Sequence, residues 1–421
     1  MHRADISTAD RHRAALLAIR SEDSGWPAEQ SLAELARLAE TAGIDVVGQV
    51  IQQLDEPQPT SYLGKGKIHE LKEQKSSLRF DSVIADDELS PAQQRYLESA
   101  LDVQVLDRTA LILHIFAMHA RTREGRLQVE LAQYRYRLPR LTGRGVELSR
   151  LGAGINTRGP GETKLESDRR RIRHRISELN REIERVREQR STHRRQRRSS
   201  GIPVVALVGY TNAGKSSLLN ALTGSEVLST DRLFATLDPT TRRMTLSTHQ
   251  EVLLTDTVGF IQKLPTDLIA AFRATLEEIT EADLILHVVD ASSPQVDEQA
   301  EAVEDELEEL GVAGRPRITA LNKSDCIPRE RLPLLRRKFS APVIVSALHA
   351  AGIDVLKARL AEALAASFVP VKVAIPYTMA ELVNLFRSRG MVEREDHRAE
   401  GTVITGRLPV TLLPNFQPFL S

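Results

Sequence analysis

Residues 209 to 216 read Gly209-Tyr210-Thr211-Asn212-Ala213-Gly214-Lys215-Ser216 and match G-x-x-x-x-G-K-[ST], the pattern of a phosphate-binding loop. An apolar run at residues 203–208 predicts a buried parallel strand before this loop, and residues 217–222 predict the helix after it. Glycines let backbone N–H groups face phosphate oxygens. We expect Lys215 to reach the β- and γ-phosphates and the Ser216 hydroxyl to bind Mg²⁺. An ordinary strand–helix turn is the alternative, which this context disfavours.

Four further short patterns follow the loop, at or near the predicted carboxyl ends of strands. They are Phe234-Ala235-Thr236-Leu237-Asp238-Pro239-Thr240, Asp256-Thr257-Val258-Gly259, Asn322-Lys323-Ser324-Asp325 and Ser346-Ala347-Leu348. Thr236 is placed to give Mg²⁺ a second hydroxyl, Asp256 to hold the ion through water, and the Gly259 N–H to sense the γ-phosphate. Each pattern alone is weak. The ordered set predicts a GTP-hydrolysing enzyme whose catalytic groups are Lys215, Thr236 and Gly259.

The carboxylate of Asp325 predicts which base is bound. It can accept hydrogen bonds from guanine N1–H and N2–H₂, whereas adenine lacks that amine and presents an acceptor at N1. A carboxylate left unpaired opposite adenine costs roughly 1–3 kcal/mol or more, and a rejection factor of about 10⁴ is plausible for such a site. A backbone N–H within residues 346–348 can meet guanine O6. The predicted ligands are therefore GTP and GDP.

Alternating strand and helix patterns predict an α/β protein in four parts. The predicted parts are a small α/β domain at residues 1–119, an antiparallel helical hairpin at 120–200, a doubly wound P-loop GTPase domain with a mostly parallel sheet at 201–368, and a small α+β module at 369–421. A helix is expected at residues 266–279. Positions 390–391 and 396–397 have the character of loop or strand edge.

Composition excludes several classes of protein. Among 421 residues there is one cysteine, Cys326, so a disulfide framework is excluded and a reducing compartment is indicated. No apolar run approaches the length of a membrane span, and the first residues lack the apolar core of a signal peptide. The formal net charge is zero, but residues 121–200 hold 23 Lys and Arg against 10 Asp and Glu, an excess of 13. This segregation predicts a polyanionic partner.

The predicted hairpin has an apolar seam and a basic loop. Its seam residues are Leu127, Leu131, Tyr134 and Leu138 on one helix and Leu165, Ile172, Ile176, Leu179, Ile183 and Val186 on the other. The loop between them, residues 141–164, is rich in glycine and arginine and cannot form a core. Arginine on flexible backbone suits RNA phosphates and shape, so we expect RNA contacts from Arg144, Arg150, Arg158 and Lys164. A solvated linker is the alternative.

The chain resembles the HflX family of ribosome-associated GTPases. Besides the nucleotide motifs, the resemblance rests on Tyr62-Leu63-Gly64-Lys65-Gly66-Lys67, Asp86-Asp87-Glu88-Leu89-Ser90-Pro91-Ala92-Gln93-Gln94, Leu106-Asp107-Arg108-Thr109 and Arg158-Gly159-Pro160-Gly161-Glu162-Thr163-Lys164. It implies a cytoplasmic protein that binds the large ribosomal subunit and its RNA and splits stalled or stressed ribosomes. It also implies that Ser216 and Thr236 are Mg²⁺ ligands and that the guanine site consists of Asn322, Lys323, Asp325 and residues 346–348. Similar members have been associated with ATP binding in the N-terminal domain, at a site this sequence does not locate.

Phe260 stands where many GTPases have a water-positioning Gln, so the enzyme alone is expected to be slow and ribosomes to accelerate it. Asn212 stands where cation-dependent relatives coordinate K⁺, although it can simply brace the loop. We expect a monomer in which GTP orders residues 233–240 and 256–263.

Two other functions stay open. One is a GTP-gated large-subunit assembly or RNA-scaffold factor without splitting activity. The other is a regulator that associates peripherally with membranes through the arginine-rich segment, which lacks the large apolar face that interfacial helices bury.

Overall fold

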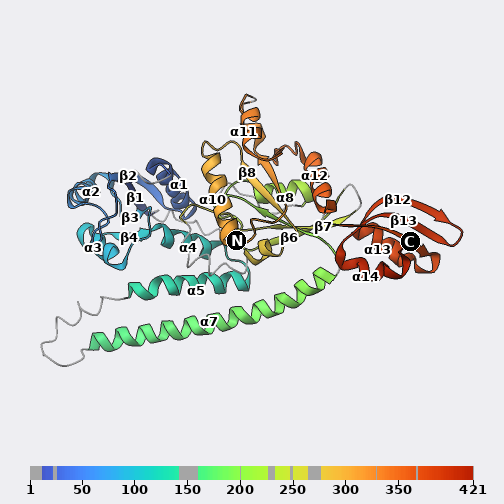
Figure 1. Ribbon diagram of the computed structural model, residues 1–421. Helices are drawn as coiled ribbons and strands as arrows, with labels where there is room; N and C mark the ends of the chain where they lie inside the picture. The colour runs from blue at the N-terminus through green and yellow to red at the C-terminus, as the bar shows by residue number, and fades with distance from the viewer. Residues whose placement is uncertain are drawn as a thin grey trace, which may run out of the picture. The chain divides into compact units, whose positions relative to one another are not determined.

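The structure, a computed structural model, describes residues 12–21, 26–141, 160–199, 201–225, 233–246, 250–263, 276–328, 330–366 and 368–420 (Figure 1). The chain forms two compact units. The first comprises Met1–Glu184 and Lys263–Phe272, and the second comprises Arg185–Gln262 and Arg273–Ser421.

A parallel four-stranded sheet with the order β2-β1-β3-β4 forms the centre of the first unit. Its strands are β1 (Arg13–Arg20), β2 (Asp45–Gln53), β3 (Ser82–Ala85) and β4 (Gln104–Asp107), and its helices are α1 (Ala28–Thr41), α2 (Lys65–Leu78), α3 (Pro91–Leu101) and α4 (Arg108–His119). The predicted parallel sheet is confirmed. Sequence reasoning missed α4, because its buried residues include Leu111, Ile112 and Leu113 in succession, which hides the helical period.

The predicted start of α3 is confirmed by a capping box. Ser90 Oγ accepts a hydrogen bond of 3.2 Å from the N–H of Gln93, and the Gln93 side chain accepts one of 2.8 Å from the N–H of Ser90. Pro91 follows in the first turn, where the missing N–H costs nothing. The capping box therefore also fixes the backbone at Ser90, where the connection from β3 to α3 ends.

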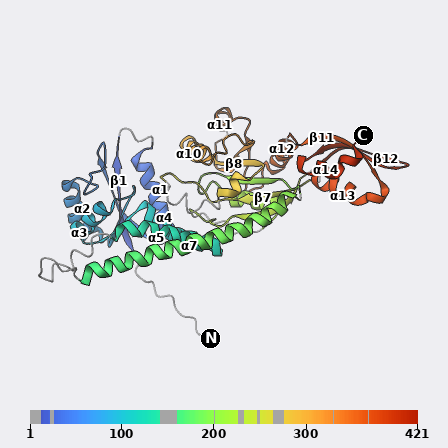
Figure 2. The ribbon, with the colours of Figure 1, turned by 60° about the horizontal axis from the view of Figure 1, so that its bottom comes forward.

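Helices α5 (Arg123–Arg140) and α7 (Pro160–Ser199) run antiparallel beside each other in both ribbon views (Figure 2). Arg175 donates two hydrogen bonds, of 2.9 and 3.0 Å, to Glu130 across the pair, and Leu127, Leu131 and Leu179 are buried in the seam. The hairpin prediction is confirmed. Residues 160–164, which were predicted to belong to the loop, are part of α7 instead, and Pro160 is suited to the first turn of a helix.

The second unit has a six-stranded sheet with the order β10-β9-β8-β5-β7-β6. The strands are β5 (Val204–Val208), β6 (Thr240–Thr245), β7 (Glu251–Asp256), β8 (Leu284–Asp290), β9 (Arg317–Asn322) and β10 (Val343–Ile344), and the helices are α8 (Lys215–Thr223), α10 (Val296–Glu309), α11 (Leu332–Lys338) and α12 (Ile353–Ala366). Only β6 runs antiparallel, at the edge of the sheet. The predicted doubly wound fold is confirmed. The helix expected at residues 266–279 falls largely outside the described residues.

A separate three-stranded antiparallel sheet with the order β11-β13-β12 ends the chain. Its elements are β11 (Val369–Pro376), α13 (Ala380–Arg389), β12 (Met391–Arg398), β13 (Gly401–Leu408) and the short helix α14 (Leu413–Phe416). Position 391 and positions 396–397 belong to β12, an edge strand, while Gly390 ends α13. The α+β prediction is confirmed. Within the described part of the chain, no helix has the length and apolar character that crossing a bilayer requires.

Candidate active site

The loop between β5 and α8 has a shape that only glycine permits at two positions. Gly209 has a φ of +156°, and a Cβ there would lie 2.2 Å from the Val288 carbonyl oxygen of the neighbouring strand. Gly214 has a φ of +88°, and a Cβ there would lie 2.3 Å from Nδ2 of Asn322. The predicted motif therefore folds tightly against β8 and β9.

Lys215, at the start of α8, is buried beneath this loop. Its Nζ donates hydrogen bonds to the carbonyl oxygens of Gly209 and Tyr210, at 3.1 and 3.0 Å. Burial lowers the pKa of Lys215 to about 8, and the nearby carboxylate of Asp256 partly opposes this change. The ammonium group is thus desolvated, which strengthens its interaction with an anion that enters the pocket.

A pocket at the carboxyl end of β5 gathers the predicted phosphate-binding groups. Its lining residues are Thr211, Asn212, Gly214, Lys215, Ser216, Ser217, Phe234, Ala235, Thr236, Thr257 and Gly259. The three predicted catalytic residues are all in this set. Ser217, which sequence reasoning did not select, follows the motif directly.

Ser216, Thr236 and Asp256 meet at one edge of the pocket. Their two hydroxyl oxygens lie 2.8 Å apart, and Asp256 Oδ2 accepts hydrogen bonds of 2.6 Å from Ser216 and 3.0 Å from Thr236. The other oxygen, Oδ1 of Asp256, is buried and has no hydrogen-bond partner among the described residues. Burial raises the pKa of Asp256, while the Lys215 ammonium and both hydroxyls oppose the rise. Two hydroxyls and an unpaired carboxylate oxygen are hard donors that fit Mg²⁺.

The segment after β7 is bonded directly to the phosphate loop. The N–H of Phe260 donates to the Gly209 carbonyl at 3.1 Å, and the N–H of Thr211 donates to the Phe260 carbonyl at 2.7 Å. A Cβ at position 259 would lie 2.7 Å from Thr211 Cα and 2.9 Å from Lys215 Nζ. Gly259 therefore lies beside the lysine that is expected to reach the γ-phosphate.

The predicted base-binding residues form one hydrogen-bonded group. Asn322 donates to the Ala213 carbonyl at 2.9 Å and accepts from the Ala347 N–H at 3.0 Å, so it joins the phosphate loop to residues 346–348. The Ser346 hydroxyl donates to Asp325, and this hydrogen bond is the main reason that the pKa of Asp325 is lowered. Asp325 is consequently held ionised, as an acceptor for guanine N–H groups must be.

Sequence reasoning missed Asp290 in this group. Its carboxylate lies 2.7 Å from Nζ of Lys323, a residue with a left-handed φ of +57°. Asp290 ends an apolar strand, β8, just as Asp256 ends β7. A polar residue at the carboxyl end of a buried strand was therefore the signal that could have identified it.

Several predicted residues lie outside the pocket lining. Tyr210, Leu237 and Val258 are buried, whereas Leu348 is 80% exposed. Ala213 and Ser324 contribute backbone groups, Ala213 to Asn322 and Ser324 to the Val345 carbonyl. Asp238 is half-buried. Arg144, Arg150 and Arg158 are outside the described residues, and Lys164 is described only as part of the α7 backbone.

The fold and this pocket define a P-loop GTPase, an enzyme that hydrolyses GTP. Comparison with family models agrees: residues 29–117 match "GTP-binding GTPase N-terminal", residues 119–197 match "GTP-binding GTPase Middle Region", and residues 204–323 match "50S ribosome-binding GTPase".

Known relatives match nearly the whole chain. A GTPase HflX of Caldanaerobacter subterraneus is 46% identical over 98% of this chain and 94% of its own length. The GTPase HflX of Escherichia coli is 41% identical over 90% of each. A solved structure, an SsGBP and GDP complex, is 26% identical, covers 83% of this chain and 98% of its own, and has a TM-score of 0.45. The chain belongs to the HflX GTPase family.

Proposed function

We propose that GTP binds with its phosphates in the loop pocket and its guanine against Asp325. Lys215 and the Gly259 N–H contact the γ-phosphate, and the desolvated ammonium favours the negative charge that develops there. Ser216 and Thr236 would hold Mg²⁺ as protein ligands, and Asp256 would accept hydrogen bonds from water bound to the ion. When bound, this ion supplies positive charge to the β- and γ-phosphate oxygens.

Hydrolysis by the enzyme alone is slow in this proposal. The pocket lining contains no Gln, Glu or His among the described residues that could orient the attacking water. The Phe260 side chain is 2% exposed and lies in the core rather than in that lining. The missing catalytic group must come from a partner or from a monovalent cation near Asn212. GTP turnover measured in K⁺ and in Na⁺ distinguishes these two sources. Equal rates in the two salts would exclude K⁺ as the missing group and indicate that a partner supplies it.

We further propose that the partner is the large ribosomal subunit and that the GTP form separates stalled ribosomes in the cytoplasm. One observation carries this proposal: helix α7, next in the chain to β5, exposes Arg170, Arg171, Arg173 and Arg181. Together with the excess of 13 positive charges in residues 121–200, this surface suits RNA phosphates. The family model that residues 204–323 match is that of a 50S ribosome-binding GTPase, which supports the same partner.

Sedimentation of intact ribosomes tests this proposal. Ribosomes are incubated with the protein and a non-hydrolysable GTP analogue, with GDP, or with the Lys215→Ala variant, which should not bind nucleotide. Separation of subunits with the analogue alone is the expected result. Binding to precursor particles without separation would favour the assembly role instead.

Salt and turnover give two further readouts. Association should weaken steeply between about 50 and 200 mM salt if phosphate contacts dominate, and ribosomes should raise GTP turnover at least about tenfold. A complex insensitive to salt would contradict an RNA-facing role for α7. Equal turnover with and without ribosomes would contradict a ribosomal activator.

A further inference from the structure

The chain passes from the second compact unit to the first at the peptide bond between Gln262 and Lys263. This bond lies three residues after Gly259, the proposed γ-phosphate contact. We call residues 259–263 the switch segment. The switch segment is short. A displacement of Gly259 must therefore either be absorbed by a few backbone torsions or also displace Lys263.

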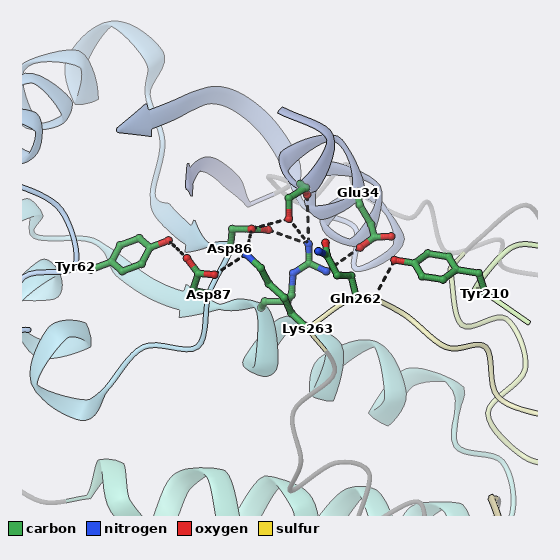
Figure 3. A network of polar contacts seen from close by, with 9 residues as sticks. Glu34, Tyr62, Asp86, Asp87, Tyr210, Gln262 and Lys263 are labelled. Atoms are coloured by element: carbon green, nitrogen blue, oxygen red, sulfur yellow. Dashed lines mark hydrogen bonds and ion pairs between the residues drawn. The ribbon is translucent and has the colours of Figure 1, made fainter. Parts of the chain in front are cut away.

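In the second unit, the switch segment is held to the phosphate loop by its backbone. Besides the two hydrogen bonds of Phe260, the N–H of Gln262 donates to the hydroxyl of Tyr210 at 2.8 Å (Figure 3). Tyr210, Phe260 and Ile261 are each at most 3% exposed. The segment therefore has little freedom to move without breaking buried hydrogen bonds.

In the first unit, the last residue of the segment is held by two carboxylates. Lys263 Nζ lies 2.5 Å from Asp86 Oδ2 and 2.5 Å from Asp87 Oδ1, as Figure 3 shows. Both aspartates follow the carboxyl end of β3. Arg108 pairs with the other oxygen of Asp86 at 2.9 Å, and Tyr62 donates to Asp87 at 2.7 Å.

Charge balance indicates that Lys263 is needed in this cluster. Glu34, Asp86 and Asp87 bring three carboxylates, and Arg108 is the cation that pairs with Glu34 and Asp86. Asp86 is 1% exposed, so its charge requires close cations. Lys263 supplies the second cation. It contacts Oδ2 of Asp86, whereas Arg108 contacts Oδ1.

The backbone conformation of Lys263 also indicates that its ion pairs hold this residue in place. Its φ of +55° is in the left-handed region, which residues with a side chain seldom adopt. Such a conformation persists where surrounding contacts hold it. Among the described residues, the two ion pairs are the contacts of the Lys263 side chain that can do so.

The composition of the pocket indicates whether the Lys263 ion pairs favour or oppose binding of a γ-phosphate. In the arrangement where Lys263 is paired, Lys215, Thr236 and Gly259 all line the phosphate pocket together. The ion pairs and a γ-phosphate therefore favour the same position of the switch segment. Two interactions that favour one state strengthen each other by equal factors.

We propose that Lys263 is a positioning residue whose ion pairs with Asp86 and Asp87 hold Gly259 in place for the γ-phosphate and so couple the first unit to the nucleotide state. GDP, which has no γ-phosphate, gains nothing from this contact. The inference rests on the phosphate site assigned under the proposed function.

The test compares affinities for a non-hydrolysable GTP analogue and for GDP in the full chain. Lys263→Gln and Asp87→Asn remove one charge each at nearly constant volume. Each variant should bind the analogue about fivefold to tenfold more weakly, with GDP affinity within about twofold of wild type. The double variant should be no weaker than Lys263→Gln alone, because that change already removes the ion pair with Asp87.

Three controls keep the outcomes distinct. Lys338→Gln removes a different lysine ion pair, with Asp297 in the second unit, and should change neither affinity. Melting curves show whether each variant is folded. If Lys215→Ala binds both nucleotides like wild type, the phosphate-site assignment fails. If that assignment holds but Lys263→Gln changes both affinities equally, changes neither, or adds fully to Asp87→Asn, the coupling is overturned.

Discussion

Oγ of Ser216 lies 2.6 Å from Oδ2 of Asp256 and donates a hydrogen bond to it, across 40 residues of sequence. Thr236 donates to the same oxygen at 3.0 Å. The last residue of the phosphate-loop motif and Thr236 therefore both contact one oxygen of Asp256, at the end of β7. Because the other carboxylate oxygen is unpaired, the cluster retains acceptor capacity for water bound to a cation.

Ser216→Ala should weaken nucleotide binding in the presence of Mg²⁺ by about tenfold or more, because it removes one proposed metal ligand and leaves Asp256 with one donor fewer. Affinity in the presence of a chelator should change much less. Titration of a fluorescent GTP analogue with and without Mg²⁺ measures both. Ser216→Thr keeps the hydroxyl and should bind like wild type; a loss in that variant equal to the alanine loss would mean that packing, not metal ligation, is affected.

Asp325→Asn should weaken GTP binding by about tenfold to a hundredfold, because the amide presents one acceptor and one donor where guanine offers two donors. Xanthosine triphosphate has a carbonyl in place of the guanine amine, so the variant should prefer it. Competition binding with the two nucleotides measures the change. Asp297→Asn, at an exposed position in the first turn of α10, is the matched control. Retained preference for GTP in the first variant would place the base elsewhere.

The sequence predicted the elements around the phosphate pocket well because those elements carry local signals. Strand β5 (Val204–Val208) lies within the predicted apolar run at residues 203–208, and helix α8 (Lys215–Thr223) includes the predicted residues 217–222. The phosphate-loop motif and the ordered motifs at strand ends identified every residue of the pocket lining except Ser217, since a parallel sheet brings its carboxyl ends to one edge.

Pairings between distant residues could not be predicted in this way. Periodicity shows which face of an element is buried, but not which side chain it meets. The contacts of Lys263 with Asp86 and of Lys323 with Asp290 span long stretches of sequence, and in each pair one partner, Lys263 or Asp290, belongs to no motif. Helix α4 was missed for another reason: its exposed face includes Ala117 and Met118, so a polar stripe does not mark its period.

His287, in β8, predicts a dependence of stability on pH. It is 2% exposed, and burial lowers its pKa to about 3, with smaller effects from Arg317 and Lys215. Below about pH 6.5 the unfolded chain takes up a proton that the folded protein excludes until about pH 3. The contribution of His287 is therefore full above pH 6.5 and is lost as the pH falls towards 3.

The corresponding experiment compares wild type with His287→Gln. Between pH 6.5 and 5.0 wild type should lose about 2 kcal/mol more unfolding free energy than the variant. Denaturant midpoints at the two pH values measure this difference. His174→Gln, which replaces an exposed histidine of α7, should keep the wild-type slope. Parallel slopes for wild type and His287→Gln would show that His287 is not the group that titrates.

Phe260→Gln should not produce a faster enzyme, although Gln is the residue that positions water in many GTPases. The Phe260 side chain is 2% exposed and is not part of the pocket lining, so a glutamine that follows its path meets the core instead of the γ-phosphate. The substitution should lower stability by about 2–4 kcal/mol, because it removes a buried ring and buries an amide. Single-turnover hydrolysis without ribosomes should stay within about twofold of wild type.

Phe260→Leu, which keeps the site apolar, provides the reference for packing alone. A tenfold rise in hydrolysis for Phe260→Gln, with no such rise for Phe260→Leu, would show that the switch segment turns this side chain towards the nucleotide during turnover.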